Sequence, residues 1–344
     1  MGIRKLCCGL AALAITLGLA VAAQAQDVTL RLHQFLPPQA TIPAQAITPW
    51  IEKVESESGG RIKIEHYPAM QLGGAPPSLY DQARDGVVDI VWTLPGYTPG
   101  RFNKIEAFEL PFMVTTAEAT SKAFYDFVQK NALDEFDDVK LLVAHTHGPG
   151  LLHVRGEGVR SLEDMEGLKL RGPTRVITGM LERLGASAVG MPVPAVPESL
   201  SKGVIDGAVI PWEVTVPLKV PELVDTHTGF SGDRGLYAAT FVMVMNKDSY
   251  ENLPDDLKQV IDDNSGIEAA ALFGAAMDAG DKVGLEKAQA TDNEIVTLDA
   301  EETARWKEAA EPSVEAWIAE MNDKGLDGAA LVEEARSLIE TYSN

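Results

Sequence analysis

The chain has 344 residues, with 51 acidic against 29 basic side chains and a formal net charge of −22 at pH 7. Such acidity disfavours nucleic acid and anionic membrane surfaces as partners, because both attract basic proteins. Cys7 and Cys8 are the only cysteines and both lie in the first 25 residues; once that segment is removed, neither disulfides nor thiol chemistry is expected.

The first 25 residues have the pattern of a secretory signal peptide. Arg4 and Lys5 form a short basic start, an apolar run covers residues 6–23, and Ala23-Gln24-Ala25 is a small-x-small cleavage site. An uncleaved membrane anchor would need a polar stop-transfer flank after the small residues, and none follows. We therefore expect export from the cytoplasm with removal of residues 1–25.

Strand and helix patterns alternate along the first half of the remaining chain. Strand patterns cover residues 28–35, 61–67, 87–92 and 139–145. Helical spacing covers residues 42–54, 78–84 and 117–133. This alternation predicts an α/β protein with parallel sheets covered by helices.

From residue 253 the composition turns helical. A first helical segment, residues 253–287, is long enough to run across a whole molecule, and further helical stretches cover residues 301–321 and 329–342.

A weak internal repeat links two parts of the chain. Residues 85–91 read DGVVDIV and residues 202–209 read KGVIDGAV. Each copy follows a short helical segment and leads into a turn that contains proline. The repeat predicts two similar α/β lobes that present strand ends to a shared cleft, where small ligands commonly bind.

Arg171 stands at the end of a predicted strand, residues 168–170. Gly172-Pro173 then turns the chain into a helical pattern that Gly185 closes. Ligands of α/β proteins gather at the carboxyl ends of strands, and a guanidinium fork suits a carboxylate or phosphate. From the residues alone, Arg171 is either a ligand clamp or one half of an internal ion pair.

Other candidate ligand-binding residues lie at strand ends or beside the repeat. Trp212 either covers the ligand or is a core aromatic. Glu213 either accepts a hydrogen bond from a ligand hydroxyl or amine, or neutralises Arg171 in the empty site. The remaining candidates end the first strand or flank the first repeat copy: His33, Gln34, Phe35, Trp92 and Tyr97.

The sequence lacks the common signatures of catalysis, such as G-x-S-x-G, G-x-x-x-x-G-K-[ST], H-E-x-x-H and a helix-opening G-x-G-x-x-G. One suggestive cluster, AHTHGPGLLH, contains His145, His147 and His153. A secreted zinc hydrolase that uses all three histidines is one hypothesis. We favour the other, in which a neutral His147 lines the cleft, because acidic ligands at diagnostic spacing are missing. We expect no catalytic residue, metal or cofactor.

Six blocks of sequence follow one another along the chain. They are HYPAMQLGGAPPSLYDQARDGVVDIV, FELPFM, SLEDMEGLKLRGP, GASAVGMPVPAV, VIDGAVIPW and YENLPDDLKQVI. In this order and spacing they resemble the periplasmic solute-binding subunits of tripartite ATP-independent periplasmic (TRAP) transporters, of the dicarboxylate-binding type. The resemblance covers essentially all of the chain after residue 25.

The resemblance implies a two-lobed periplasmic-binding-protein fold with a long lobe-spanning helix and a helical C-terminus. It implies lobe I at residues 26–148 plus 236–276, and lobe II with the C-terminal helices at residues 149–235 plus 277–344. Such a protein is not an enzyme: it closes by a hinge motion over a small organic acid in the periplasm and delivers it to integral-membrane permease subunits. In the family, the arginine that matches Arg171 grips the substrate carboxylate.

Two departures from the family's pattern bear on the ligand. Many relatives carry a second arginine near the position of Leu151, and an asparagine where this chain has Ile210. A buried ligand group without a partner costs about 1–3 kcal/mol, so we expect an aromatic or branched apolar monocarboxylate. A dicarboxylate or sugar acid bound by the same fold is the alternative, and an ATP-driven transporter's receptor is another within the binding class.

Overall fold

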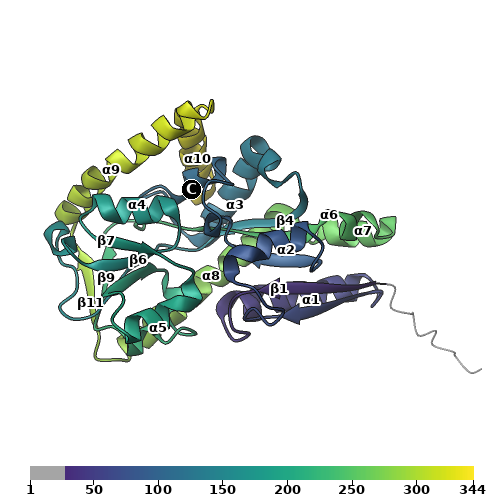
Figure 1. The fold of residues 1–344 in the computed structure, drawn as a ribbon, viewed down its shortest axis with the longest axis horizontal. Helices are drawn as coiled ribbons and strands as arrows, with labels where there is room; N and C mark the ends of the chain where they lie inside the picture. The colour runs from purple at the N-terminus through teal and green to yellow at the C-terminus, as the bar shows by residue number, and fades with distance from the viewer. Residues whose placement is uncertain (1–27) are drawn as a thin grey trace, which may run out of the picture.

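The computed structural model describes residues 28–344, so the predicted signal peptide lies outside the described residues. The strands form two separate sheets, and each sheet with its helices makes one of the two lobes visible in Figure 1. The family fold expected from the sequence, two α/β lobes with a helical C-terminal part, is confirmed.

The first sheet has five strands. In spatial order they are β2 (Ile62–Tyr67), β1 (Val28–Gln34), β3 (Ile90–Thr93), β10 (Thr240–Asn246) and β4 (Val139–Thr146). Its lobe also contains the helices α1 (Thr48–Glu57), α2 (Leu79–Arg84) and α3 (Ala117–Phe127). Each predicted strand of the first half overlaps one of these strands.

The second sheet has six strands. In spatial order they are β11 (Glu294–Leu298), β9 (Thr226–Phe230), β5 (Leu151–Val154), β8 (Gly207–Ile210), β6 (Lys169–Gly172) and β7 (Ser187–Gly190). Its connecting helices include α4 (Arg175–Arg183) and α5 (Val196–Ser201). Strand β11 was not expected from the sequence, because the composition of the last quarter of the chain predicts helix throughout.

Both sheets are mixed, so the expectation of purely parallel sheets was wrong for one strand in each. β10 runs antiparallel to β3 and β4, and β5 runs antiparallel to β8 and β9. These are the two strands that the chain enters directly from a strand of the other sheet, without an intervening helix. A chain that crosses directly arrives at the edge where the parallel strands end, and it therefore runs through the new sheet in the opposite direction. β11 also follows a strand of the first sheet, but helices intervene and it runs parallel to β9. The exact lobe boundaries given above stay a prediction.

The C-terminal part adds α6 (Lys247–Glu251), α7 (Asp255–Asp263), α8 (Gly266–Gln289), α9 (Ala300–Asp323) and α10 (Gly328–Ser343). The single helix expected over residues 253–287 is thus broken between α7 and α8. Gly266 has a φ of 85° at the break, a conformation that glycine adopts without strain. Within residues 28–344, no helix is long and apolar enough to cross a bilayer.

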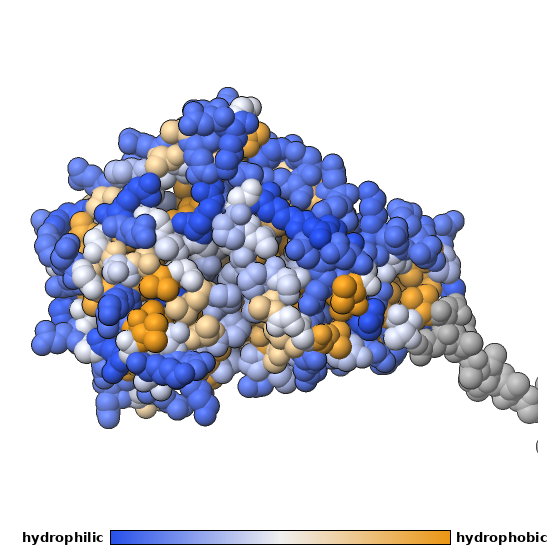
Figure 2. All heavy atoms as spheres, viewed as in Figure 1, coloured by the Kyte–Doolittle hydropathy of each residue, from blue (hydrophilic) through white to orange (hydrophobic). Residues whose placement is uncertain are grey.

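Helix α8 contacts both lobes. It packs on α3 and β4 of the first lobe and on the short turn η9 (Trp212–Val214), which follows β8 of the second. In Figure 1 it runs between the two sheets, whereas α9 and α10 lie along one side of the molecule. Figure 2 shows hydrophilic residues over the outer rims of this face and paler residues along the boundary between the lobes.

Two glycines one turn apart on α8 allow η9 to come close. A Cβ atom on Gly284 would overlap the backbone carbonyl of Trp212, and one on Gly280 would lie 2.8 Å from Cβ of Glu213. The absence of side chains at these two positions therefore sets where η9, and with it Glu213, sits.

We predict that Gly284→Ala lowers the free energy of unfolding by about 1–3 kcal/mol, the usual cost of overpacking. The matched control is Gly179→Ala in α4, where a Cβ would meet only the end of the flexible Arg183 side chain, 3.3 Å away. There the alanine should stabilise by up to about 1 kcal/mol through helix propensity. Urea denaturation measures both; equal shifts in the two variants would contradict the packing argument.

Candidate ligand-binding site

A small cavity lies between the two sheets. The first lobe and its loops contribute Phe35, Leu36, Trp92, Leu94, Tyr97, His147, Ala239 and Phe241 to its wall. The second lobe contributes Arg171, Pro173, Val193, Ile210, Pro211, Glu213 and Val214, and Tyr237 comes from the segment that crosses between the sheets. The cavity is therefore built from both lobes.

Aromatic rings make the wall on the side of the first lobe. The ring of Trp92 stacks on Phe35 and on Phe241, with centroids 4.9 and 5.0 Å apart. Tyr97 meets the edge of Phe35 at 5.7 Å. The indole N–H of Trp92 is already satisfied, because it donates to Nε2 of His145 at 2.8 Å. The stack thus offers an apolar surface to whatever enters the cavity.

Arg171 is the one cationic side chain in the cavity lining, and it is only 2% exposed. Its Nε donates to the carbonyl oxygen of Met191 at 2.9 Å and its Nη1 to that of Val209 at 3.1 Å. Burial lowers the pKa of the guanidinium, yet arginine remains charged in proteins. Within residues 28–344 no carboxylate forms an ion pair with it. The internal ion pair that the sequence left open is therefore not formed by this part of the chain.

Two tyrosine hydroxyls lie near the guanidinium. Tyr97 Oη accepts a hydrogen bond from the backbone N–H of Val193 at 3.0 Å, which leaves its own proton free to donate. Tyr237 is 1% exposed, and its hydroxyl forms no hydrogen bond with the described residues. Burial raises the pKa of both hydroxyls, so they keep their protons. Both can act as donors beside Arg171.

Glu213 is 4% exposed, and its Oε2 has no hydrogen-bond partner in the described chain. Its backbone N–H donates to Oδ1 of Asp281 on α8 at 2.8 Å. Burial, followed by repulsion from Asp281, raises the pKa of Glu213 to about 8. It is an uncharged acid at neutral pH and forms no ion pair with Arg171, so it does not neutralise the arginine in this conformation.

His147 lines the cavity with both ring nitrogens engaged. Nδ1 donates to the carbonyl oxygen of Gly148 at 2.6 Å, and Nε2 accepts from the N–H of Ala239 at 2.9 Å. Burial lowers its pKa to about 4, so the ring is neutral. It offers the cavity a surface but no free hydrogen-bonding atom.

The three histidines of the hydrolase hypothesis do not converge. His145 lies in β4 of the first sheet, whereas His153 lies in β5 of the second and bonds to His227 through the two Nδ1 atoms at 2.6 Å. Among residues 28–344 no group of three or more His, Cys, Asp or Glu side chains is placed to hold a metal.

Three candidates from the sequence lie outside the cavity lining. Trp212 packs its ring against His153 and His227 and borders a groove beside α8 instead. His33 bonds to Gln82, and Gln34 donates to the carbonyl oxygen of Leu36 at 2.9 Å. Gln34 thereby holds the turn that presents Phe35. Phe35, Trp92, Tyr97, His147, Arg171 and Glu213 do line the cavity.

Phe241 and Tyr237 line the cavity but were missed by the sequence analysis. Both belong to the segment that enters β10, whose amino end faces the cleft because the strand is antiparallel. A search restricted to the carboxyl ends of strands passes over them. The only signal for them is the apolar run of residues 236–245.

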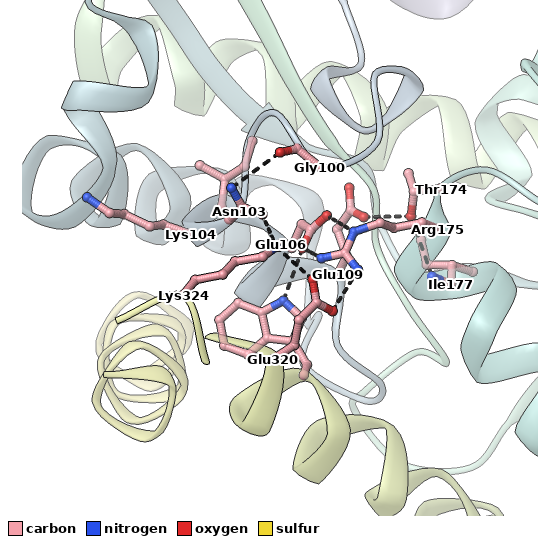
Figure 3. Close-up of polar contacts among 12 residues, drawn as sticks. Gly100, Asn103, Lys104, Glu106, Glu109, Thr174, Arg175, Ile177, Glu320 and Lys324 are labelled. Carbon is pink, nitrogen blue, oxygen red and sulfur yellow. Dashed lines mark hydrogen bonds and ion pairs between the residues drawn. The ribbon is translucent and has the colours of Figure 1, made fainter. Parts of the chain in front are cut away.

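A polar cluster joins the lobes just beyond Arg171, and we call Glu106, Glu109, Thr174, Arg175 and Glu320 the interlobe cluster (Figure 3). Thr174, at the start of α4, donates to Oε2 of Glu109 at 2.6 Å. Arg175 donates through Nε to Oε1 of Glu106 at 2.6 Å and through Nη1 to Glu320 at 2.8 Å. The two glutamates at 106 and 109 belong to the turn η4 (Lys104–Glu109), which packs on β10 and α3 of the first lobe.

We predict that Glu213→Gln stabilises the empty protein increasingly as the pH rises from about 4.5 to about 8. Glutamate has a pKa of about 4.3 when unfolded and one of about 8 in the fold. In this window the unfolded wild type releases a proton that the folded state retains, so wild-type stability falls. Asp281, whose pKa burial raises to about 7, faces it and adds to the same trend in both proteins.

Chemical denaturation at pH 5 and pH 8 measures this difference. The control is Glu182→Gln at an exposed position of α4, which should show no such trend. A gain for Glu213→Gln that is the same at both pH values would contradict the burial of an uncharged Glu213.

Comparison with known families gives a match over most of the chain. The profile of the bacterial extracellular solute-binding proteins, family 7, matches residues 33–320. A TRAP solute-binding protein from Rhodoferax ferrireducens T118, solved in complex with copurified benzoate, is 50% identical with a TM-score of 0.90, and the alignment covers 92% of this chain and 98% of that one.

Two further solved structures are similar. One is a marine metagenome TRAP solute-binding protein specific for aromatic acid ligands, in complex with 3-hydroxybenzoate; it is 50% identical with a TM-score of 0.91, over 93% of this chain and 100% of that one. The other, from Bordetella bronchiseptica with bound (R)- and (S)-mandelate, is 31% identical with a TM-score of 0.85, over 91% and 99% of the two chains.

Proposed function

The chain belongs to family 7 of the bacterial extracellular solute-binding proteins, the TRAP type, and from that premise we propose that it captures an aromatic monocarboxylate. One observation carries the proposal: a buried Arg171, with no counter-ion among residues 28–344, lines a cavity walled by stacked aromatic rings. The three similar structures described above, each with an aromatic acid, support the same ligand class.

The ligand carboxylate binds at Arg171. Backbone carbonyls use two of the five guanidinium N–H groups, and the others are open to the hydroxyl of Tyr97 and to a ligand carboxylate. A carboxylate there neutralises the buried charge through charge-assisted hydrogen bonds. The hydroxyls of Tyr97 and Tyr237 lie close enough to the guanidinium to donate to the same carboxylate.

The aromatic ring of the ligand packs against the wall formed by Phe35, Trp92 and Phe241, opposite Val193 and Ile210. A second carboxylate would find no second cation in the lining, which makes a diacid costly. Of the two positions where the dicarboxylate-binding type carries polar residues, Ile210 lines the cavity, whereas Leu151, opposite it on β5, does not. The alternative of a dicarboxylate or sugar acid is therefore less favourable.

Binding is coupled to closure of the lobes, because the cavity wall comes from both. The ligand contacts both lobes only when they are closed and so shifts the population toward that form. The interlobe cluster stabilises the same form. The exported protein acts in the periplasm, without catalysis, and delivers the acid to the integral-membrane subunits of a TRAP permease.

We predict that Arg171→Gln weakens binding of benzoate by at least about 30-fold, because truncating one partner of a buried charge pair costs roughly 2–5 kcal/mol. Arg183→Gln, at an exposed position of α4, is the matched control and should bind as the wild type does. Isothermal titration calorimetry measures both. Binding of succinate or glucuronate in place of benzoate would contradict the ligand class and leave the family unaffected.

We also predict that Arg175→Met speeds ligand release about fivefold, which corresponds to about 1 kcal/mol for a partly exposed ion pair. The variant removes the contacts of Arg175 with Glu106 and Glu320 and leaves the cavity lining intact. Stopped-flow displacement of bound benzoate gives the rate, with Arg183→Met as the control. An unchanged release rate would show that the interlobe cluster does not hold the closed form.

A further inference from the structure

We propose that the carboxyl group of Glu213 hydrogen-bonds a hydroxyl group on the ligand, so that the site selects a hydroxylated aromatic monocarboxylate over the unsubstituted acid. This inference rests on the proposed function and makes Glu213 the residue that determines selectivity among aromatic acids.

The first argument is the unpaired oxygen. Oε2 of Glu213 is fully buried and has no hydrogen-bond partner within residues 28–344. Such an atom is unfavourable in the empty site, because a buried polar group without a partner costs free energy. A ligand group that pairs with it removes that cost, and a purely apolar ligand leaves it in place.

The other polar groups in the cavity lining are already hydrogen-bonded or are needed to bind the ligand carboxylate. His147 has both ring nitrogens engaged by backbone groups. Arg171 and the two tyrosine hydroxyls are donors and serve the carboxylate. Glu213 is the remaining polar side chain of the lining. It is not needed to bind the ligand carboxylate, and its Oε2 is unpaired.

The third argument is that Glu213 is held in place. Its backbone N–H is bonded to Asp281, its backbone carbonyl accepts from Oγ1 of Thr41 at 3.3 Å, and its Cβ faces Gly280 of α8. Its backbone is therefore fixed against α8 and Thr41, and its side chain lines the cavity. It also lies apart from Arg171, since the two form no ion pair, so a ligand can engage both at two separate points.

The balance of charges in the cavity determines which kind of ligand group can hydrogen-bond to Glu213. The ligand carboxylate and Arg171 cancel, so a second buried negative charge would be unfavourable. Asp281 on α8 repels a charged Glu213, while His147 is neutral and Tyr237 is protonated. An uncharged carboxylic acid both donates and accepts, as a hydroxyl does, whereas a ligand ammonium group would require an ionised Glu213 and a second ligand carboxylate would add a buried negative charge.

The test compares benzoate with 2-, 3- and 4-hydroxybenzoate and with the three corresponding fluorobenzoates by calorimetry, in the wild type, Glu213→Leu and Glu213→Ala. We expect one hydroxybenzoate isomer to bind the wild type about tenfold more tightly than benzoate, the size of one buried hydrogen bond. Its fluoro analogue should show no such advantage. In both variants the advantage should disappear, so that the affinity ratio of the hydroxylated acid to benzoate falls to about one.

Every other outcome contradicts either the role of Glu213 or the proposed function. A wild type that binds no hydroxybenzoate more tightly than benzoate overturns the inference, and so does an advantage that persists in the Glu213 variants. The alanine variant covers the case in which leucine does not fit and the protein fails to fold. If none of these acids binds the wild type, the proposed function itself fails, which is distinguishable from failure of the Glu213 assignment alone.

Discussion

The site depends on one buried positive charge that the described part of the protein does not neutralise. Arg171 is held by two backbone carbonyl oxygens, which orient the guanidinium without cancelling its charge. Removing an ion from water is expensive unless it is paired. The fold therefore keeps the empty site in an unfavourable electrostatic state that a carboxylate relieves. Glu213 does not supply the missing negative charge, because its burial and the repulsion from Asp281 keep it protonated.

The architecture fixes the relative positions of the two lobes whose residues line the cavity. The parallel strands of each sheet end at the cleft, and the two antiparallel strands begin there, so both sheets direct side chains into it. Helix α8 fixes parts of both lobes at once: Asp278 accepts hydrogen bonds from the backbone at the start of α3, and Asp281 accepts one from η9. Beyond Arg171, the interlobe cluster of Figure 3 ties α4 to the first lobe.

Much of this could be predicted from the sequence, because periodicity and strand ends carry direct information. The strand end that places Arg171 and the aromatic positions Phe35, Trp92 and Tyr97 followed from those patterns. Trp212 did not, because it and Glu213 are adjacent in a short turn, and only the packing of η9 on α8 decides which side chain faces the cavity. Phe241 and Tyr237 were missed because strand direction, which sequence patterns do not show, brings them to the cleft.

The most direct test of the central claim is a crystal structure of the mature protein with benzoate. The account predicts the ligand carboxylate within hydrogen-bonding distance of the free N–H groups of Arg171, with the ring against Trp92 and no protein carboxylate paired to the arginine. A structure in which Arg171 is paired with an acidic side chain of the protein, or in which the carboxylate of benzoate lies elsewhere, would contradict it.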